Sequence, residues 1–235
     1  MGVFRFKGFE VDDYGCGMKI CSDSVLLAAW FLEPYSWAKT ILDVGTGSGV
    51  LALMAAKICP DAFITAVEID SAAADAARKN FVGSPWASRL RCDTADINDY
   101  ASTHAPDIII SNPPYFTNGA ASSDASRAAA RHQASLTYET LLALPLAPGG
   151  HLGMVTPADA CDSIIFEAEM RRRKLCRLCR VRTSQSKDAV RLLWDFSDAD
   201  CGYCEEILDL RDADGRYSDA YRRIVEPYYL KLSER

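Results

Sequence analysis

The sequence has no long apolar run and no excess of positive charge. None of its 235 residues lie in a stretch that approaches the roughly 20 apolar residues of a membrane-spanning helix, so we expect no membrane partner. The N-terminal residues alternate between polar and apolar types and lack the apolar core of a signal peptide. The formal net charge is −6, so the chain can bind RNA phosphates only if its basic residues gather on one face.

The chain has nine cysteines, an odd number without a secretory signal. This pattern favours free thiols in a reducing compartment, and we therefore expect a cytoplasmic protein. The pairs Cys176-x-x-Cys179 and Cys201-x-x-Cys204 have the internal spacing of zinc ligands. Cys176 and Cys179 fall in a strand-like stretch, however, where residues at i and i+3 face opposite sides of a sheet. We expect no metal, and a metal assay on the purified protein decides between the two interpretations.

Strand and helix patterns alternate along residues 24–160. Short apolar or β-branched runs predict strands, and longer segments with apolar residues at helical spacing predict helices. Such alternation is typical of a doubly wound, mostly parallel sheet, in which ligands bind at the carboxyl ends of the strands. The predicted strands are 40–44, 64–68, 90–92, 107–111 and 150–156, and the predicted helices are 24–32, capped by Ser22 or Ser24, 49–58, 71–82 and 136–145.

The two ends of the chain follow other patterns. Residues 175–181, 190–196 and 206–210 read as strands without intervening helices, which predicts an antiparallel C-terminal edge on the same sheet. The alternation along residues 3–11 predicts a short N-terminal hairpin. We expect a seven-stranded α/β sheet in a single domain (1–235), with an N-terminal hairpin extension (1–22), a core (38–160) and a C-terminal antiparallel part (161–235).

A glycine-rich turn, residues 43–49 (DVGTGSG), follows the first core strand. Its glycines, which allow a tight turn and a close backbone approach to a ligand, are Gly45, Gly47 and Gly49. The spacing differs from the G-x-G-x-x-G of dinucleotide enzymes and favours a ligand that combines one nucleoside with an amino acid. Glu68, at the end of the next strand, can accept both ribose hydroxyls. Asp43 can counter the ammonium group of the amino acid, and Asp96 can accept from an adenine amino group.

A second motif, Asn112-Pro113-Pro114-Tyr115, follows the apolar strand 107–111. At the carboxyl end of a central strand it faces the crevice where the ligand would lie. The Asn112 side-chain oxygen and the Pro113 carbonyl can both accept hydrogens of an exocyclic amine, which orients a lone pair that is otherwise delocalised into a ring. Tyr115 can stack on a base, which must leave its own stack to reach the pocket. The motif indicates chemistry on a planar exocyclic nitrogen without a strong general base.

Further segments match a known family along most of the chain. They are Phe4-Arg5-Phe6-Lys7 with Phe9, Met18-Lys19 followed by Ser22-Asp23, Ser84-Pro85-Trp86-Ala87, Thr94-Ala95-Asp96 and Tyr217-Ser218-Asp219-Ala220-Tyr221. With these segments the chain resembles the bacterial tRNA1(Val) (adenine-37-N6)-methyltransferase family, within the class I methyltransferases. The glycine and Asn-Pro-Pro-Tyr motifs are common to many amino methyltransferases, whereas the Met-Lys segment, Ser-Pro-Trp-Ala and the tail are more specific.

The resemblance implies a Rossmann-like class I fold with S-adenosyl-L-methionine as the cofactor. It implies methyl transfer to N6 of an adenine in tRNA, at position 37 of tRNA1(Val), without a metal. It places Lys19, Ser22 and Asp23 near the cofactor, although Ser22 stands where the family has threonine. We also place Ile69, next to Glu68, and Asn112 at this site. We expect a monomer that requires no protein partner.

Two basic segments are candidate RNA contacts. One is the long stretch 117–135 after the second motif, close to where a target base would enter, and the other is 171–182, which holds seven Lys or Arg. Local clusters of this kind reconcile RNA binding with an acidic total charge. For the second segment, the alternative to RNA binding is a solvent-exposed helix face whose charges serve no ligand. The candidate residues are Arg127, Arg131 and His132 in the first segment and Arg171, Arg172, Arg173 and Lys174 in the second.

Other functions share parts of this pattern. A protein-glutamine N5-methyltransferase acts on a planar amide, but such enzymes carry a helical N-terminal domain, and only 39 residues precede the first core strand here. An rRNA or DNA amino methyltransferase is a further alternative, although DNA enzymes usually add a target-recognition domain for which no spare length exists. A cofactor-binding protein without catalysis would not need Asn112 and Tyr115. The non-catalytic interpretation of the motif is a simple Pro-Pro turn.

Overall fold

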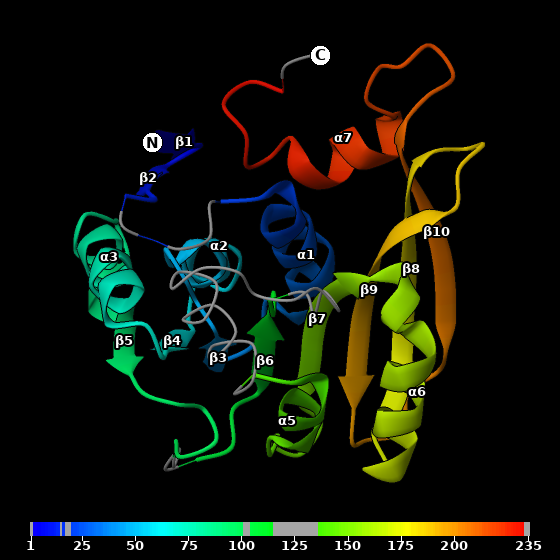
Figure 1. Ribbon diagram of the computed structural model, residues 1–235. Helices are drawn as coiled ribbons and strands as arrows, with labels where there is room; N and C mark the ends of the chain where they lie inside the picture. Colours follow the sequence, from blue (N-terminus) through cyan, green and yellow to red (C-terminus); the bar gives the residue numbers. More distant parts are fainter. Residues whose placement is uncertain (1, 15, 17–19, 101–103, 115–135, 233–235) are drawn as a thin grey trace, which may run out of the picture.

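The computed structural model describes residues 2–14, 16, 20–100, 104–114 and 136–232 (Figure 1). Its centre is an eight-stranded sheet in the order β10-β8-β9-β7-β6-β3-β4-β5. A separate hairpin consists of β1 (Val3–Phe6) and β2 (Phe9–Asp12). The strands of the large sheet are β3 (Thr40–Val44), β4 (Phe63–Glu68), β5 (Leu90–Thr94), β6 (Ile108–Ser111), β7 (His151–Pro157), β8 (Lys174–Ser184), β9 (Ala189–Ser197) and β10 (Cys204–Arg211).

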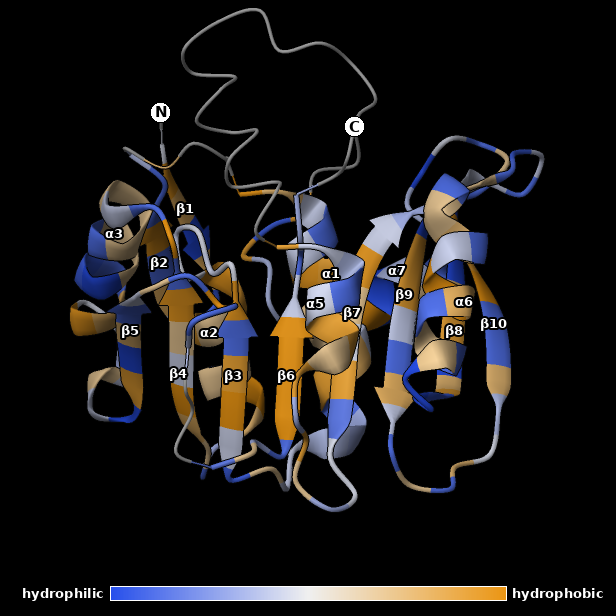
Figure 2. Ribbon diagram, turned by 60° about the horizontal axis from the view of Figure 1, so that its bottom comes forward, coloured by the Kyte–Doolittle hydropathy of each residue, from blue (hydrophilic) through white to orange (hydrophobic). Residues whose placement is uncertain are grey.

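The strands from β3 to β7 form the parallel core of the sheet. β3 pairs in parallel with both β4 and β6, β4 pairs with β5, and β6 pairs with β7. The side chains of Ile108, Ile109 and Ile110 in β6 are fully buried because hydrophobic clusters lie on both faces of the sheet. A strand in this position requires a continuous apolar run, and Figure 2 shows β6 as hydrophobic along its length. The predicted doubly wound, mostly parallel sheet is confirmed.

The C-terminal strands extend the sheet in a way that was only partly predicted. β9 runs antiparallel to both β7 and β8, which confirms an antiparallel element at this edge. β10, however, pairs with β8 and not with β9, and this pairing is parallel. All eight segments predicted as strands are in this one sheet, whereas a seven-stranded sheet was expected. A pattern of alternating residues identifies a strand, but it does not specify which neighbour that strand pairs with.

Helices cover both faces of the sheet. They are α1 (Ser22–Leu32), α2 (Val50–Ile58), α3 (Ser71–Val82), α5 (Tyr138–Ala143), α6 (Cys161–Met170) and α7 (Asp219–Val225). Side chains of α1, α2, α3 and α7 pack on one face, and side chains of α5 and α6 pack on the other. Gly153 of β7 lets α1 come close to the sheet, because a Cβ there would overlap the ring of Phe31. No helix within the described ranges is long and apolar enough to cross a membrane.

The predicted N-terminal hairpin is confirmed, and it is attached to two distant parts of the chain. Phe6 forms an antiparallel bridge with Tyr229, close to the C-terminus. Asn80 of α3 joins the hairpin to the glycine-rich turn, since it accepts from the Asp12 amide (3.0 Å) and donates to the Ser48 carbonyl (2.8 Å). The hairpin is therefore held beside the turn that sequence analysis assigned to ligand binding.

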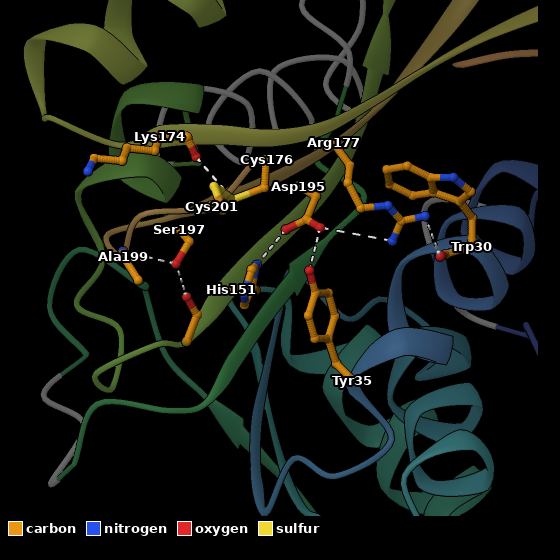
Figure 3. Close-up of polar contacts among 11 residues, drawn as sticks. Trp30, Tyr35, His151, Lys174, Cys176, Arg177, Asp195, Ser197, Ala199 and Cys201 are labelled. Carbon is orange, nitrogen blue, oxygen red and sulfur yellow. Dashed lines mark hydrogen bonds and ion pairs between the residues drawn. A yellow bond between two sulfur atoms is a disulfide. The ribbon is translucent and has the colours of Figure 1, made fainter. Parts of the chain in front are cut away.

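Cys176 and Cys201 form a disulfide (Figure 3). The prediction of free thiols is therefore wrong for these two cysteines. Each Cys-x-x-Cys pair gives one sulfur to this bond, and the remaining members, buried Cys179 and exposed Cys204, are free. The spacing that resembles a zinc site thus corresponds to a link between β8 and the segment that precedes β10.

A β-bulge brings Cys176 to a buried polar cluster on one face of the sheet. The register of β8 against β9 shifts between Leu175 and Arg177, so Cys176 is the extra residue. The carboxylate of Asp195 accepts from the Tyr35 hydroxyl (2.6 Å) and lies 2.8 Å from Nδ1 of His151 (Figure 3). Possible metal-ligating atoms of His151, Cys176 and Asp195 lie within 4.8 Å of one another, but the cysteine sulfur is already committed to the disulfide.

Candidate functional site

The carboxyl ends of the parallel strands bring the predicted site residues to one edge of the sheet. β3 leads into the glycine-rich turn, β4 ends at Glu68, and β6 ends directly before Asn112. Parallel pairing places these ends side by side, because Asp43 is opposite Ala66 of β4 and Ile110 of β6. Side chains that lie far apart in the sequence therefore share the edge where ligands bind in folds of this kind.

The backbone of the glycine-rich turn requires glycine. The angle φ is +71° at Gly45, +56° at Gly47 and +85° at Gly49, all in the left-handed region. A Cβ at Gly45 would press on Leu136 and one at Gly49 would overlap Phe81, whereas a Cβ at Gly47 would meet no described atom within 4 Å. The turn is thus packed against protein at two glycines and open at Gly47, where a ligand can approach the backbone.

Asp43 is buried behind this turn, with 0% of its surface exposed. Its Oδ2 atom accepts from the Thr46 hydroxyl (2.5 Å) and from the Ala52 amide (3.0 Å). Its Oδ1 atom is buried and has no hydrogen-bond partner among the described residues. Burial raises the pKa of Asp43 to about 7, with a smaller contribution from the Glu68 carboxylate and against the effect of the two hydrogen bonds. A buried acceptor without a partner fits a ligand that brings a cationic donor.

Glu68 supports the turn from the end of β4. Its Oε2 atom accepts from the Gly47 amide (2.9 Å), and its Oε1 atom accepts from the Asp70 amide (3.0 Å). Each carboxylate oxygen can accept a second hydrogen bond, so the side chain retains capacity for a pair of ribose hydroxyls. The side chain is 8% exposed, which limits competition from water.

The other predicted cofactor residues have different surroundings. Ile69, which follows Glu68, is 38% exposed. Asp96, which follows β5, accepts from both the backbone and the side-chain nitrogen of Asn98, so it also shapes its own turn. Lys19 lies outside the described residues.

Asn112 is held by the start of α1. Its Nδ2 atom donates to the Ser24 hydroxyl (2.9 Å) and to the Cys21 sulfur (3.2 Å), and the side chain is 9% exposed. The preceding residue, Ser111, donates through its hydroxyl to the Val44 carbonyl of β3 (2.8 Å). Pro113 and Pro114 lie after the end of β6 and have no regular secondary structure, and Tyr115 lies outside the described residues. The amide of Asn112 is thus fixed both through its backbone neighbour and through its side chain.

The start of α1 differs from the prediction in one respect. Cys21 is the N-cap residue and makes no side-chain capping bond, so neither Ser22 nor Ser24 caps the helix. Ser22 is exposed. Asp23 forms an ion pair with Arg191 of β9, with 2.8 Å between Oδ2 and Nε. At least one of its carboxylate oxygens is therefore bound within the protein and not by a ligand.

Comparison with known protein families shows where a chain with this fold and these motifs belongs. Residues 11–166 match the family model described as the methyltransferase small domain. The chain belongs to this family. The chain is also 39% identical to the tRNA1(Val) (adenine(37)-N6)-methyltransferase of Photobacterium profundum and 40% identical to that of Aeromonas hydrophila, in both cases over 97% of this chain and 98% of the relative.

The structural comparison agrees with the family. The fold is similar to that of a predicted O-methyltransferase from Agrobacterium tumefaciens, with a TM-score of 0.68 and 16% sequence identity, over 87% of this chain and 96% of that chain. At this identity the similarity concerns the fold alone. It confirms the Rossmann-like fold that the resemblance implied.

The residues predicted to contact RNA in this methyltransferase lie in two segments. Arg127, Arg131 and His132 lie outside the described residues. Arg171 is paired with Glu167, Arg173 with Asp198 and Lys174 with Asp200, while Arg172 is exposed. Three of the four cations form ion pairs with carboxylates, which reduces their attraction for phosphate. RNA binding by the segment 171–174 stays a prediction.

Sequence reasoning did not identify Ser24 or Cys21 as neighbours of Asn112. Ser24 was considered only as a possible helix cap, and Cys21 was assigned no role. Both lie close to the matched Ser22-Asp23 segment. The only signal available was their position at the start of an apolar helix, which does not show that the helix begins beside β6.

Proposed function

We propose that this chain transfers a methyl group from S-adenosyl-L-methionine to N6 of an adenine in tRNA, at position 37 of tRNA1(Val). The observation that carries the proposal is the identity of 39–40% with relatives of that name over nearly the whole of both chains. The arrangement of Asp43, Glu68 and Asn112 at one edge of the sheet supports it. The alternative of a protein-glutamine methyltransferase is not favoured, because these full-length relatives are named for tRNA.

The residues of the turn fit S-adenosyl-L-methionine, which supplies an activated methyl group on a sulfonium centre. Glu68 would bind the ribose hydroxyls, and the open backbone at Gly47 would lie against the ligand. Asp43 would accept from the ammonium group through Oδ1, the buried oxygen without a partner. Asp96 and Ile69 would contact the adenine side, and Lys19, Ser22 and Asp23 would complete the site, as the family resemblance implies.

Asn112 and the residues after it would hold the target amine. The side-chain oxygen of Asn112 and the carbonyl of Pro113 would accept the two amine hydrogens and so direct the nitrogen lone pair away from the ring. Tyr115 would stack on the base, with Pro114 keeping the motif rigid. Because Asn112 is only 9% exposed, little water would compete with its side-chain oxygen for the amine.

The surroundings of the tRNA are also part of the proposal. Arg127, Arg131 and His132 would contact the RNA near the target base, and the segment 171–174 would contribute mainly through Arg172, since its other cations are paired. We propose that the enzyme acts in the cytoplasm as a monomer without a required protein partner and without a metal.

Methylation of defined substrates tests the proposal. The enzyme is incubated with labelled S-adenosyl-L-methionine and a tRNA1(Val) transcript, a matched transcript with guanine at position 37, or ribosomal termination factors. Label in N6-methyladenosine from the first transcript alone is expected. Label only in protein, or equal label in both transcripts, would contradict the proposal. The variant Asn112→Ala is expected to lose all but a slow residual transfer, while its affinity for S-adenosyl-L-methionine stays within about twofold, since its main contact is to the target.

A further inference from the structure

Two side chains at the start of α1 contact the amide nitrogen of Asn112. The hydroxyl of Ser24 lies 2.9 Å from Nδ2, and the sulfur of Cys21 lies 3.2 Å from the same atom. Ser24 and Asn112 are 5% and 9% exposed, so water competes little for this contact. The Ser24 hydroxyl also lies 3.7 Å from the Cys21 sulfur. The three side chains form a closed polar group between α1 and the end of β6.

The contact matters because the two ends of a carboxamide have opposite chemistry. The nitrogen carries two donors and the oxygen only acceptors, so only the oxygen can receive the hydrogens of an exocyclic amine. With both amide hydrogens directed at α1, Oδ1 is turned away from the helix. An amide rotated by half a turn would present donors to the amine, and the interaction would become repulsive.

We propose that Ser24 is a positioning residue that sets the orientation of the Asn112 amide, with Cys21 in a lesser supporting role. The inference rests on the role proposed above for Asn112. Ser24 is the stronger partner because a hydroxyl oxygen is a good acceptor and a thiol sulfur a weak one. When Ser24 accepts from Asn112, its own proton remains available for the Cys21 sulfur, so every group in the cluster can be satisfied.

The position of Ser24 is itself fixed by packing. The remaining residues of α1, from Val25 to Leu32, are buried in the core. The ion pair between Asp23 and Arg191 ties the first turn of the helix to β9. Cys21 caps the helix without a side-chain bond, and Ser24 does not act as the cap. The hydroxyl of Ser24 therefore does not cap the helix, and packing of α1 fixes its position opposite Asn112.

Kinetics of a matched pair of serine variants test the inference. Ser24→Ala removes the acceptor, and Ser163→Ala is the control, because Ser163 is likewise the third residue of a helix but is exposed on α6. We expect Ser24→Ala to lower kcat for tRNA about tenfold, the effect of one neutral hydrogen bond. The KM for tRNA and the affinity for S-adenosyl-L-methionine should stay near those of the control, whereas the melting temperature should fall by a few degrees, because a buried amide donor loses its partner.

A double-mutant cycle separates positioning from a general structural role. If Ser24 acts through Asn112, then Ser24→Ala should cost nothing further in the Asn112→Ala background, measured in single turnovers with excess enzyme. An equal loss in both backgrounds, or a loss of cofactor affinity, would overturn the inference. Should Ser24→Ala fail to fold, Cys21→Ala provides the same cycle, with an expected twofold to threefold loss that also vanishes without Asn112.

Failure of the positioning role of Ser24 can be distinguished from failure of the proposed function. If the wild-type enzyme does not methylate the tRNA transcript, the proposed function fails. If the wild-type enzyme methylates it and Ser24→Ala is equally active, only the positioning role fails.

Discussion

The buried carboxylate of Asp43, in which only Oδ1 lacks a hydrogen-bond partner, makes the stability of the free enzyme depend on pH. Burial raises its pKa from 3.8 to about 7. Because the folded state then holds a proton that the unfolded state has released, the contribution to stability is fully present below the unfolded pKa and is lost as the pH rises through about 7. A shift of about three units corresponds to about 4 kcal/mol for this fully buried group.

The variant Asp43→Asn isolates this contribution. An asparagine oxygen can still accept from Thr46 and Ala52, the two donors that Asp43 serves through Oδ2. The variant has no charge to bury, so its stability should lack this fall with pH. Urea unfolding followed by tryptophan fluorescence, at pH 4 and pH 8, gives the difference between the two proteins. We expect wild type to lose about 4 kcal/mol relative to the variant between these values.

Ligand binding should have the opposite pH dependence. If the ammonium group of S-adenosyl-L-methionine pairs with ionised Asp43, affinity should increase as the pH rises through about 7, and Asp43→Asn should remove that increase. Titration calorimetry across this range measures it. Parallel pH profiles of stability for wild type and variant would refute the assignment of a proton to Asp43. Equal affinities of the two proteins for the ligand at pH 8 would refute its role at the ammonium group.

Three further predictions each concern one contact in the structure. Glu68→Gln keeps the shape of the side chain but loses its charge, so affinity for S-adenosyl-L-methionine should fall about tenfold in the same calorimetric assay. Reduction of the disulfide between Cys176 and Cys201, 25 residues apart, should lower the free energy of unfolding by about 3 kcal/mol, and Cys176→Ser should be insensitive to reductant. Gly153→Ala should destabilise the protein by about 1–3 kcal/mol, because the added methyl group overlaps Phe31; an unchanged urea midpoint would contradict the close packing of α1.

The core of the fold was predictable because its strands and helices have strong periodic patterns. The strand predicted at 40–44 and the helix predicted at 71–82 have the observed bounds of β3 and α3. Both are short apolar or alanine-rich segments with a clear start and end, so local sequence determines them. α7, by contrast, was not predicted, because its seven residues are only partly apolar and its stability comes from packing on β10 and α1.

The candidate site was predictable only where its residues have a recognisable spacing along the chain. The glycines of the turn and Glu68 are recognisable from spacing along the chain, and they do lie together. The contact of Ser24 with Asn112 depends on where α1 docks, and that depends on many buried contacts. The disulfide was missed for a similar reason, since a β-bulge redirects Cys176 and no residue type signals the bulge.

The side chain of Asn80 connects the hairpin to the glycine-rich turn of the proposed cofactor site. One amide bonds both to Asp12 in β2 and to Ser48 in the glycine-rich turn, so neither segment can shift without a cost to the other. Thermodynamic linkage is reciprocal: if a cofactor changes the affinity of the hairpin for any molecule, that molecule changes the affinity for the cofactor by the same factor. If the turn binds the cofactor as proposed, a molecule that displaces the N-terminal hairpin is expected to change the affinity for the cofactor.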